Sequence, residues 1–240
     1  NLKNKKDFDK ALLLRYAVCL NNDGRTSESI EIYKKLGEKV EPKAETDLID
    51  ISQSKLERLT AINSDSSDFG TFIYKNTLYF SSTRKNPEKE KRLNKKLYKW
   101  NEEPFLDIYE AVIDENNESL SMKPVNSKNY SLKNINTIAH EASVALTKNG
   151  DTMYYAGGEV KNNKLVYNNR GTSNLKLKRA TWDSGLQQWV VNQQDTAMNH
   201  FDFVNYSIGN PALSLDYKRL YFVTCAPFST AQGQTDIYYV

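Results

Sequence analysis

The spacing of apolar residues is helical at the start of the chain and becomes strand-like further on. One apolar stripe predicts a helix over roughly 7–21; its members are Phe8, Leu12, Tyr16 and Leu20. A turn containing Gly24 follows, and a second stripe predicts another helix; its members are Ile30, Tyr33 and Leu36. Thr26 or Ser27 is expected to cap this second helix, with Glu28 in its first turn. The chain is therefore predicted to begin with a helical hairpin.

The stretch between these helices and the first strands is polar. A short helix over 44–51 and a strand over 56–62 are expected in it, and 63–68 is a cluster of turn-forming residues. The domain boundary is placed here. The chain then divides into three parts: a helical hairpin (1–42), a linker with a leading strand (43–66) and a β domain (67–240).

A short hairpin is written three times in the β domain. Its copies are Phe69–Phe80, Ala142–Tyr155 and Asn210–Phe222. Each copy has a strand of small and apolar residues, a polar turn, and a second strand that ends in an aliphatic residue and two aromatic residues. The first of the two aromatic residues is, in turn, Tyr79, Tyr154 and Tyr221. Because internal repetition is typical of repeat architectures, the β domain is predicted to consist of units in series.

Further strands complete each unit. Third strands follow a variable loop in every copy, at 106–109, 175–178 and 235–238. Fourth strands are expected near 121–125 and 188–192. Four antiparallel strands per unit, with units in series, are typical of a β-propeller. The predicted fold class is mainly β with an α-helical N-terminus: a helical hairpin followed by an incomplete propeller of about three blades, the last one truncated. The native protein is expected to continue past Val240, because a propeller closes its ring to hide strand edges.

The third copy resembles a known repeat, the PD40 (WD40-like) propeller repeat. That repeat usually reads Pro-Ala-Phe-Ser-Pro-Asp-Gly-Lys-x-Leu-Tyr-Phe, followed by Ser-Asp-Ile-Tyr. The matching residues are Pro211, Ala212, Ser214, Asp216, Leu220, Tyr221, Phe222, Asp236, Ile237 and Tyr238. The second copy has a strong hairpin turn at Asn149 and Gly150. The segment 135–142, which contains His140 and Glu141, resembles the Asn-Thr-x-x-His-Glu sequence that precedes a blade in a narrower group.

That narrower group is the tetratricopeptide–PD40–OmpA-like outer-membrane lipoproteins of Bacteroidota. The helical hairpin is similar to a tetratricopeptide repeat at four positions, Gly24, Ser29, Tyr33 and Pro42; an ordinary helical hairpin is the alternative. Helices followed by PD40 blades is the domain order of the group, which includes PorE-like proteins of the type IX secretion system. The resemblance covers most of 67–240 and, more weakly, 7–42.

The resemblance implies a non-enzymatic scaffold or adaptor. Such a protein docks other proteins of an envelope or secretion complex at the periplasmic side of the outer membrane, as an accessory component of type IX secretion or a related envelope assembly. It implies no cofactor, membrane attachment only through a lipid anchor that the chain does not show, and peptidoglycan binding only through a further C-terminal domain. Loops 83–105 and 158–174 are the candidates for partner choice. The alternative is a propeller that binds glycan or peptidoglycan with Tyr and Trp on one face; a weaker one is a propeller-containing hydrolase.

Single residues offer little candidate chemistry. His140 and Glu141 are the nearest to a metal site or an acid–base pair, but no second cluster supports zinc, so His140 is expected to hydrogen-bond within the fold, and His200 likewise. Asp107 and Asp236 occupy equivalent third-strand positions and are expected to accept hydrogen bonds that hold neighbouring loops. No catalytic, cofactor-binding or metal-binding residue is therefore assigned.

Charge and cysteines add two expectations. The net charge of +3 argues against a general nucleic-acid binder. The loop 84–100 holds eight Lys or Arg against two Glu; a solvated insertion is favoured over a patch for an anionic lipid or glycan, and Trp100 is expected to hold the end of the loop on the sheet. Cys19 and Cys225 are expected to be free, half-buried thiols rather than a disulfide, so they do not fix the compartment.

Overall fold

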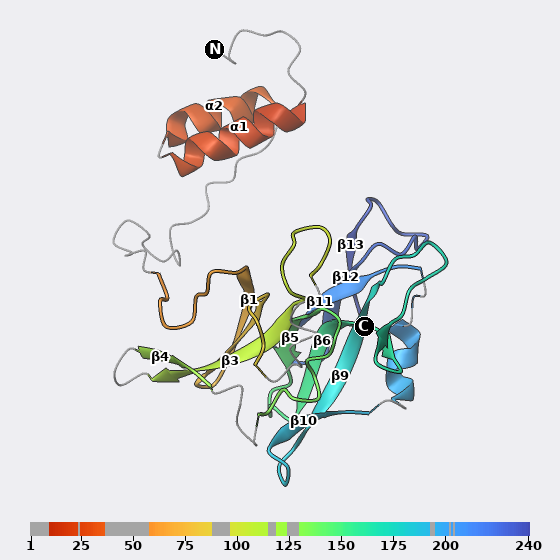
Figure 1. Ribbon diagram of the computed structural model, residues 1–240. Helices are drawn as coiled ribbons and strands as arrows, with labels where there is room; N and C mark the ends of the chain where they lie inside the picture. Colours follow the sequence, from red (N-terminus) through yellow and green to blue (C-terminus); the bar gives the residue numbers. More distant parts are fainter. Residues whose placement is uncertain are drawn as a thin grey trace. The chain divides into compact units, whose positions relative to one another are not determined.

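Two units make up the chain, and each is described by itself. The computed structural model in Figure 1 divides into Asn1–Leu56 and Glu57–Val240, a break that falls within the part assigned to the linker, 43–66. The helix expected over 44–51 lies outside the described residues. The described residues are 10–23, 25–36, 58–87, 97–114, 119–123, 130–192, 195–201, 203 and 205–240.

A helical hairpin forms the described part of the first unit. It consists of α1 (Lys10–Asn22) and α2 (Thr26–Lys35). Ala17 and Leu20 are buried between the helices, and the buried Ser29 hydroxyl donates to the Ala17 carbonyl oxygen at 2.8 Å. The small side chain of Ser29 allows a close approach of the helices, and its bond satisfies the hydroxyl away from water.

The expected cap of α2 is wrong. Its N-cap is Arg25, with no side-chain hydrogen bond, and Thr26 and Ser27 belong to the helix. The Arg25 guanidinium instead donates to both carboxylate oxygens of Glu28, each at 2.8 Å. Glu28 in the first turn thus pairs with Arg25, the residue before the helix. The sequence alone did not show that this ion pair would form in place of a cap by the hydroxyl of Thr26 or Ser27.

Antiparallel sheets build the second unit, and their strands follow the chain in order (Figure 1). Sheet 1 contains β1 (Asp68–Tyr74), β2 (Thr77–Ser82), β3 (Asp107–Asp114) and β4 (Ser119–Met122). Sheet 2 contains β5 (Glu141–Leu146), β6 (Thr152–Gly158), β9 (Leu175–Asp183) and β10 (Gln188–Val191). Sheet 3 contains β11 (Ile208–Leu213), β12 (Leu220–Thr224) and β13 (Asp236–Tyr239). The remaining elements are the hairpin of β7 (Val160–Lys161) and β8 (Lys164–Leu165) and the 3₁₀ helix η4 (Thr196–Phe201). The predicted mainly β fold with helices near the N-terminus is confirmed.

The strand expected over 56–62 is wrong in its described part. Residues 58–62 form a turn, in which the N–H groups of Ile62 and Asn63 both donate to the Leu59 carbonyl oxygen, at 3.0 and 2.9 Å. Ile62 is buried against the aromatic and aliphatic side chains on one face of sheet 1. A single buried residue in a turn therefore accounts for the apolar pattern that the sequence assigned to a strand.

The first two strands of each sheet are paired in the same pattern. In each, the first strand pairs with the second, and the register shifts once, at Gly70, Ser143 and Asn210 in sheets 1, 2 and 3. These residues have positive φ values of 68°, 51° and 50°. A β-bulge with a left-handed residue bends and twists its strand. The repeat in the sequence is thus also a repeat of backbone geometry.

The two aromatic residues of each second strand point to opposite faces, because side chains alternate along a strand. They do not end the strands as expected, since β2, β6 and β12 continue to Ser82, Gly158 and Thr224. Tyr79 of sheet 1 packs in one core cluster with Tyr155 and Trp189 of sheet 2. Its neighbour Phe80 packs on the other face of sheet 1, with Ile62. One aromatic residue of the pair therefore faces the next sheet, and the other faces away from it.

The same arrangement continues at the second boundary and ends at sheet 3. Tyr154 of sheet 2 packs with Phe222 of sheet 3. The corresponding face of sheet 3 holds Tyr221, which is half-buried, together with Ile237 and Tyr239, which are 73% and 62% exposed. Among the described residues, this face of sheet 3 is therefore open, whereas its counterparts in sheets 1 and 2 are covered.

We predict that Tyr79→Ala and Tyr221→Ala differ in cost although both residues occupy the same register position. Tyr79 is 5% exposed, so its truncation leaves a cavity and should lower the free energy of unfolding by about 3–5 kcal/mol. Tyr221→Ala should cost about 1 kcal/mol or less, because that face is open. Denaturant titration followed by tryptophan fluorescence measures both; equal costs would contradict the difference in packing.

Candidate functional site

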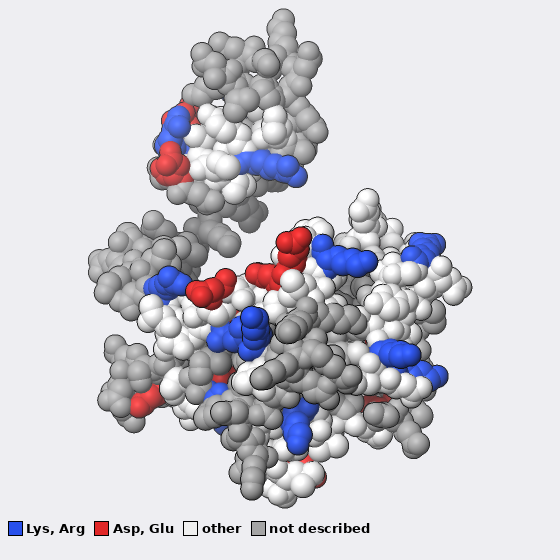
Figure 2. Space-filling model, viewed as in Figure 1, with Lys and Arg blue, Asp and Glu red and all other residues white. Residues whose placement is uncertain are grey.

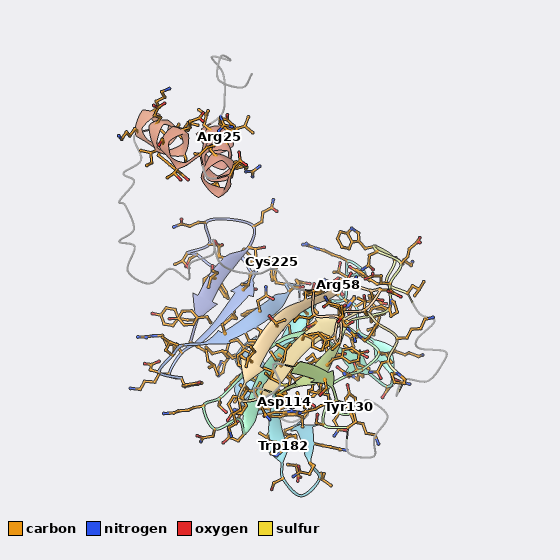
Figure 3. The ribbon with its side chains drawn as sticks, turned by 90° about the vertical axis from the view of Figure 1, so that its left-hand side faces the viewer. Arg25, Arg58, Asp114, Tyr130, Trp182 and Cys225 are labelled. Atoms are coloured by element: carbon orange, nitrogen blue, oxygen red, sulfur yellow. The ribbon has the colours of Figure 1, made fainter. Side chains whose placement is uncertain are left out.

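The candidate site lies in the segment 130–141, called here the connecting segment, which leads from sheet 1 into β5. It contains the Asn-Thr-x-x-His-Glu sequence. Tyr130, labelled in Figure 3, and Leu132 and Ile135 are buried in the core cluster shared by sheets 1 and 2. The polar side chains of the segment are therefore held at the boundary between the two sheets.

The Asn136 amide pairs with the open edge of β3. Its Oδ1 accepts the backbone N–H of Ile108 and its Nδ2 donates to the carbonyl oxygen of the same residue, both at 2.8 Å. The Nδ2 also donates to the Tyr130 hydroxyl at 2.7 Å, and that hydroxyl donates to the Ile108 carbonyl oxygen at 3.3 Å. Asn136 thus gives Ile108 the two bonds that a neighbouring strand would give it.

His140 joins the same two elements. Its Nδ1 accepts the backbone N–H of Leu106 at 3.1 Å, and the N–H of Glu141 donates to the Leu106 carbonyl oxygen at 2.9 Å. The imidazole also packs against the rings of Tyr98 and Phe105, with centroids 4.6 and 4.5 Å away. Because Nδ1 accepts a hydrogen bond, the ring is the neutral tautomer with its proton on Nε2.

Glu141 is fully buried, and its carboxylate turns back to Thr137. The Thr137 N–H donates to one oxygen at 2.9 Å, and the Thr137 hydroxyl donates to the other. Burial raises the pKa of Glu141 to about 8; the negative charge of Asp107 acts in the same direction, whereas the charge of Lys178 and the Thr137 bonds oppose it. Burial also lowers the pKa of Lys178, whose Nζ donates to the Gly158 carbonyl oxygen at 2.5 Å.

The two third-strand aspartates hold loops. Asp107 begins β3 and Asp236 begins β13, and each faces the last residue of the second strand in its sheet. Asp107 is buried and accepts the Asn86 side-chain amide at 2.6 Å. Asp236 accepts the backbone N–H groups of Gln232 and Gly233 at 3.2 and 3.3 Å. Each carboxylate thus binds the loop that precedes its own strand.

The Asn149–Gly150 turn is held by the neighbouring sheet. Gly150 has a φ of 71°, and a Cβ at this position would lie 2.4 Å from the Tyr74 ring. The Tyr74 hydroxyl donates to the Lys148 carbonyl oxygen at 3.1 Å. The turn therefore needs glycine for its conformation and for the close approach of β1.

Asp216 shapes the corresponding turn of sheet 3. Its carboxylate accepts the Ser214 hydroxyl at 2.5 Å and the Lys218 N–H at 3.1 Å. These two bonds lower the pKa of Asp216. The next residue, Tyr217, takes a φ of 57° at the position where the PD40 repeat usually has glycine. The turn therefore forms despite this departure from the usual repeat.

The bulges of the first strands contact one another. The Ser143 N–H donates to the Ser81 hydroxyl at 3.2 Å, and the Ser143 hydroxyl donates to Oδ1 of Asn210 at 3.1 Å. A Cβ on Gly70 would lie 3.6 Å from the Ser81 Oγ and 3.8 Å from the Ser143 Oγ. Residues of all three sheets thus meet here, where β5 lies beside both β1 and β11 (Figure 1).

Several single residues depart from expectation. Trp100 is 84% exposed, so it does not hold its loop on the sheet. Arg84 is no solvated charge of the basic loop: it pairs with Asp68 at 2.6 Å and lies over the Phe80 ring. Cys19 and Cys225 are free as expected, but both are exposed rather than half-buried. His200 is exposed in η4.

The described part of the chain has neither a metal-binding cluster nor a membrane-spanning helix. It contains no group of three His, Cys, Asp or Glu residues that could hold a metal ion. No described helix has both the length and the apolar character needed to cross a membrane. The carboxylates and the histidine of the site instead have the protein partners named above.

Comparisons with known proteins add no assignment. No family model matches the chain, and no curated protein or solved structure gives a significant match. The function is therefore inferred from the geometry of the site and from the resemblance of the repeats.

We predict that Asn136→Ala lowers the free energy of unfolding by about 2–4 kcal/mol, because two backbone groups of Ile108 lose their partner. Asn134→Ala is the matched control: Asn134 is exposed, and its amide donates to the Trp189 carbonyl oxygen at 3.2 Å. The control should cost about 1 kcal/mol or less. Urea unfolding measures both variants, and equal costs would contradict the role of Asn136 at the β3 edge.

We also predict that ionisation of Glu141 makes the protein less stable as the pH rises. The folded-state pKa of about 8 lies above the ordinary value of 4.5. The protonated form therefore stabilises the fold fully below the ordinary value, and this contribution is lost as the pH rises through about 8. Glu141→Gln should flatten the dependence of Tm on pH in this window, whereas the exposed Glu102→Gln should not. Identical pH profiles of Glu141→Gln and the unmodified protein would disprove the assignment.

Proposed function

We propose that the second unit is part of a β-propeller and that the chain is a non-enzymatic scaffold, or adaptor, of the cell envelope. The propeller is supported by antiparallel sheets in series that share a register, a bulge position and an alternating aromatic pair. First strands that lie side by side, with outer strands farther along each sheet, are typical of blades arranged around an axis. The open face of sheet 3 supports an arrangement in which a further blade packs there.

One observation carries the scaffold proposal: the residues nearest to a catalytic pair hold sheets together. His140 and Glu141 are bonded to Leu106 and Thr137, and Asn136 completes the edge of β3. Such bonds favour a rigid frame whose loops remain available for partners. Figure 2 shows Lys and Arg interspersed with Asp and Glu on the visible face, which suits protein partners better than a polyanion.

The resemblance to the tetratricopeptide–PD40–OmpA-like lipoproteins supplies the proposed location and partners. We place the protein at the periplasmic side of the outer membrane, as an accessory component of type IX secretion or a related envelope assembly. Its partners are other proteins of that assembly; a lipid anchor and a peptidoglycan-binding domain would be separate features. Loops 83–105 and 158–174 are the proposed sites of partner choice, the second through the β7–β8 hairpin and the exposed Tyr167.

We predict that crosslinking in intact cells, followed by affinity purification and mass spectrometry, recovers defined envelope proteins with the chain. The double variant Tyr167→Ala/Arg170→Ala should reduce the recovery of at least one of them several-fold, because both side chains are exposed in loop 158–174. Lys148→Ala, an exposed change in another turn, is the control. Recovery of no envelope protein would refute the adaptor function, and equal recovery with all variants would refute the role of this loop.

A glycan- or peptidoglycan-binding propeller is the second candidate, and the open face of sheet 3 favours it. The rings of Tyr221 and Tyr239 have centroids 5.7 Å apart, and the Arg219 guanidinium lies 5.6 Å from the Tyr239 centroid. An exposed tyrosine and a half-buried one beside an arginine suit a sugar with acidic groups. The scaffold is preferred, because the same face of sheets 1 and 2 is covered by protein. Binding of soluble peptidoglycan fragments that is lost in Tyr239→Ala would reverse this preference.

A further inference from the structure

The turn before β3 is ordered by its own backbone. Leu97 and Pro104 form an isolated antiparallel bridge. Within it, the Tyr98 N–H donates to the Glu103 carbonyl oxygen at 2.7 Å, and the Glu102 N–H donates to the Tyr98 carbonyl oxygen at 2.8 Å. Glu102 takes a φ of 58° to close the turn. Residues 97–101, called here the tip, are therefore presented by a closed turn.

The tip is also fixed to the body of the second unit. The Tyr98 ring packs edge-on to His140 and lies 5.9 Å, centroid to centroid, from Phe105. The Glu103 carboxylate accepts the hydroxyls of Ser67 and Thr83, both at 2.7 Å. Figure 1 shows the yellow-green loop before β3 standing out from the sheets. The outward position of the tip is therefore built into the fold.

The tip exposes three apolar side chains to solvent. Trp100 is 84% exposed, Leu97 is 47% exposed and Tyr98 is 39% exposed. The other two tryptophans are packed on each other, with ring centroids of Trp182 and Trp189 5.3 Å apart. Three neighbouring apolar side chains exposed together on one fixed turn, rather than a single one, point to an interaction surface.

The sequence that carries the tip is rich in basic residues. Lys95 and Lys96 precede the tip directly and Lys99 lies within it. Residues 84–103 contain eight Lys or Arg against four Glu. One of the eight, Arg84, is paired with Asp68, and one of the four, Glu103, is bonded to hydroxyls. The sequence that carries the tip is therefore net basic, which favours an anionic partner.

Apolar and aromatic side chains interleaved with lysine fit the surface of an anionic bilayer. Trp and Tyr rings prefer the headgroup level, and lysines near the surface are attracted by anionic lipids. The five residues of the tip are too few to form a stable protein interface by themselves, because such an interface needs about 20–30 residues a side; loop 83–105 contributes to partner choice only together with other surfaces. Contact with a bilayer also accounts for the exposed tryptophan of the turn, which a merely solvated insertion would not need.

We propose that the tip docks on the surface of an anionic lipid bilayer, with the Trp100 ring at the headgroup level and Lys99 near lipid phosphates. This contact holds one loop of the second unit directly against a membrane. It goes beyond the scaffold function and does not depend on it, because it requires neither a protein partner nor a lipid anchor.

Tryptophan fluorescence of the full chain tests the proposal. With Trp182 and Trp189 packed together, Trp100 is the one tryptophan of the chain that is exposed. Vesicles of phosphatidylcholine with phosphatidylglycerol should shift its emission to the blue, and brominated lipids should quench it. Vesicles of phosphatidylcholine alone should have little effect, and added salt should reverse part of the binding.

Variants identify the residues responsible. Lys99→Glu should lower the vesicle partition coefficient about fivefold or more, and Trp100→Phe should weaken it and abolish the blue shift. Leu186→Ala and Lys148→Glu, exposed changes in other turns, should leave partitioning unchanged. Near-UV circular dichroism from the Trp182–Trp189 pair checks that each variant is folded.

Three outcomes would overturn the proposal. The first is a complete lack of vesicle binding, which would make the tip a solvated turn. The second is binding that persists in Lys99→Glu and in Trp100→Phe, which would place the contact elsewhere. The third is binding of a soluble anionic polysaccharide but not of anionic vesicles, which would make the partner a glycan.

Discussion

The second unit depends on one constraint. β4 pairs only with the second half of β3, so the backbone groups on the same side of the first half need other hydrogen-bond partners. At Ile108 the partners come from Asn136, and at Leu106 they come from His140 and the N–H of Glu141. Buried backbone groups without partners are costly, so these bonds also fix the path of the connecting segment. Once that path is fixed, Tyr130, Leu132 and Ile135 fill the space between sheets 1 and 2.

Alternation along the second strands then joins the sheets in one direction. Tyr79 and Tyr154 each face the sheet that follows, while Tyr155 and Phe222 face the sheet that precedes. The same two-residue step therefore serves both boundaries, and the connecting segment adds further packing at the first of them. The bulges of the first strands bring Ser143 into contact with the sheets on both sides.

Much of this fold could be predicted from the sequence, because its hairpins carry local signals. Aromatic pairs, polar turns and alternation located the strands of all three sheets, and Asn149–Gly150 located a turn. The helices followed from their apolar stripes. What failed was non-local: Asn136 serves a residue 28 positions away, and no spacing rule connects the two. Arg84 was interpreted as a solvated loop charge, because its partner Asp68 lies 16 positions earlier, on the neighbouring strand β1. Trp100 was interpreted as a packed residue, because aromatic side chains are usually packed.

The bonds of the connecting segment also bear on how the repeat divides into folding units. The copied sequence begins with the first strand of each sheet. The residues that complete sheet 1, however, come after its fourth strand, at Asn136 and His140. A fragment cut after Met122 would contain every strand of sheet 1 and still leave Ile108 without its side-chain partner. The repeated sequence therefore does not contain all the residues that complete its sheet, because the connecting segment that follows it supplies the bonds at the β3 edge. A fragment that retains these bonds has to extend to Glu141.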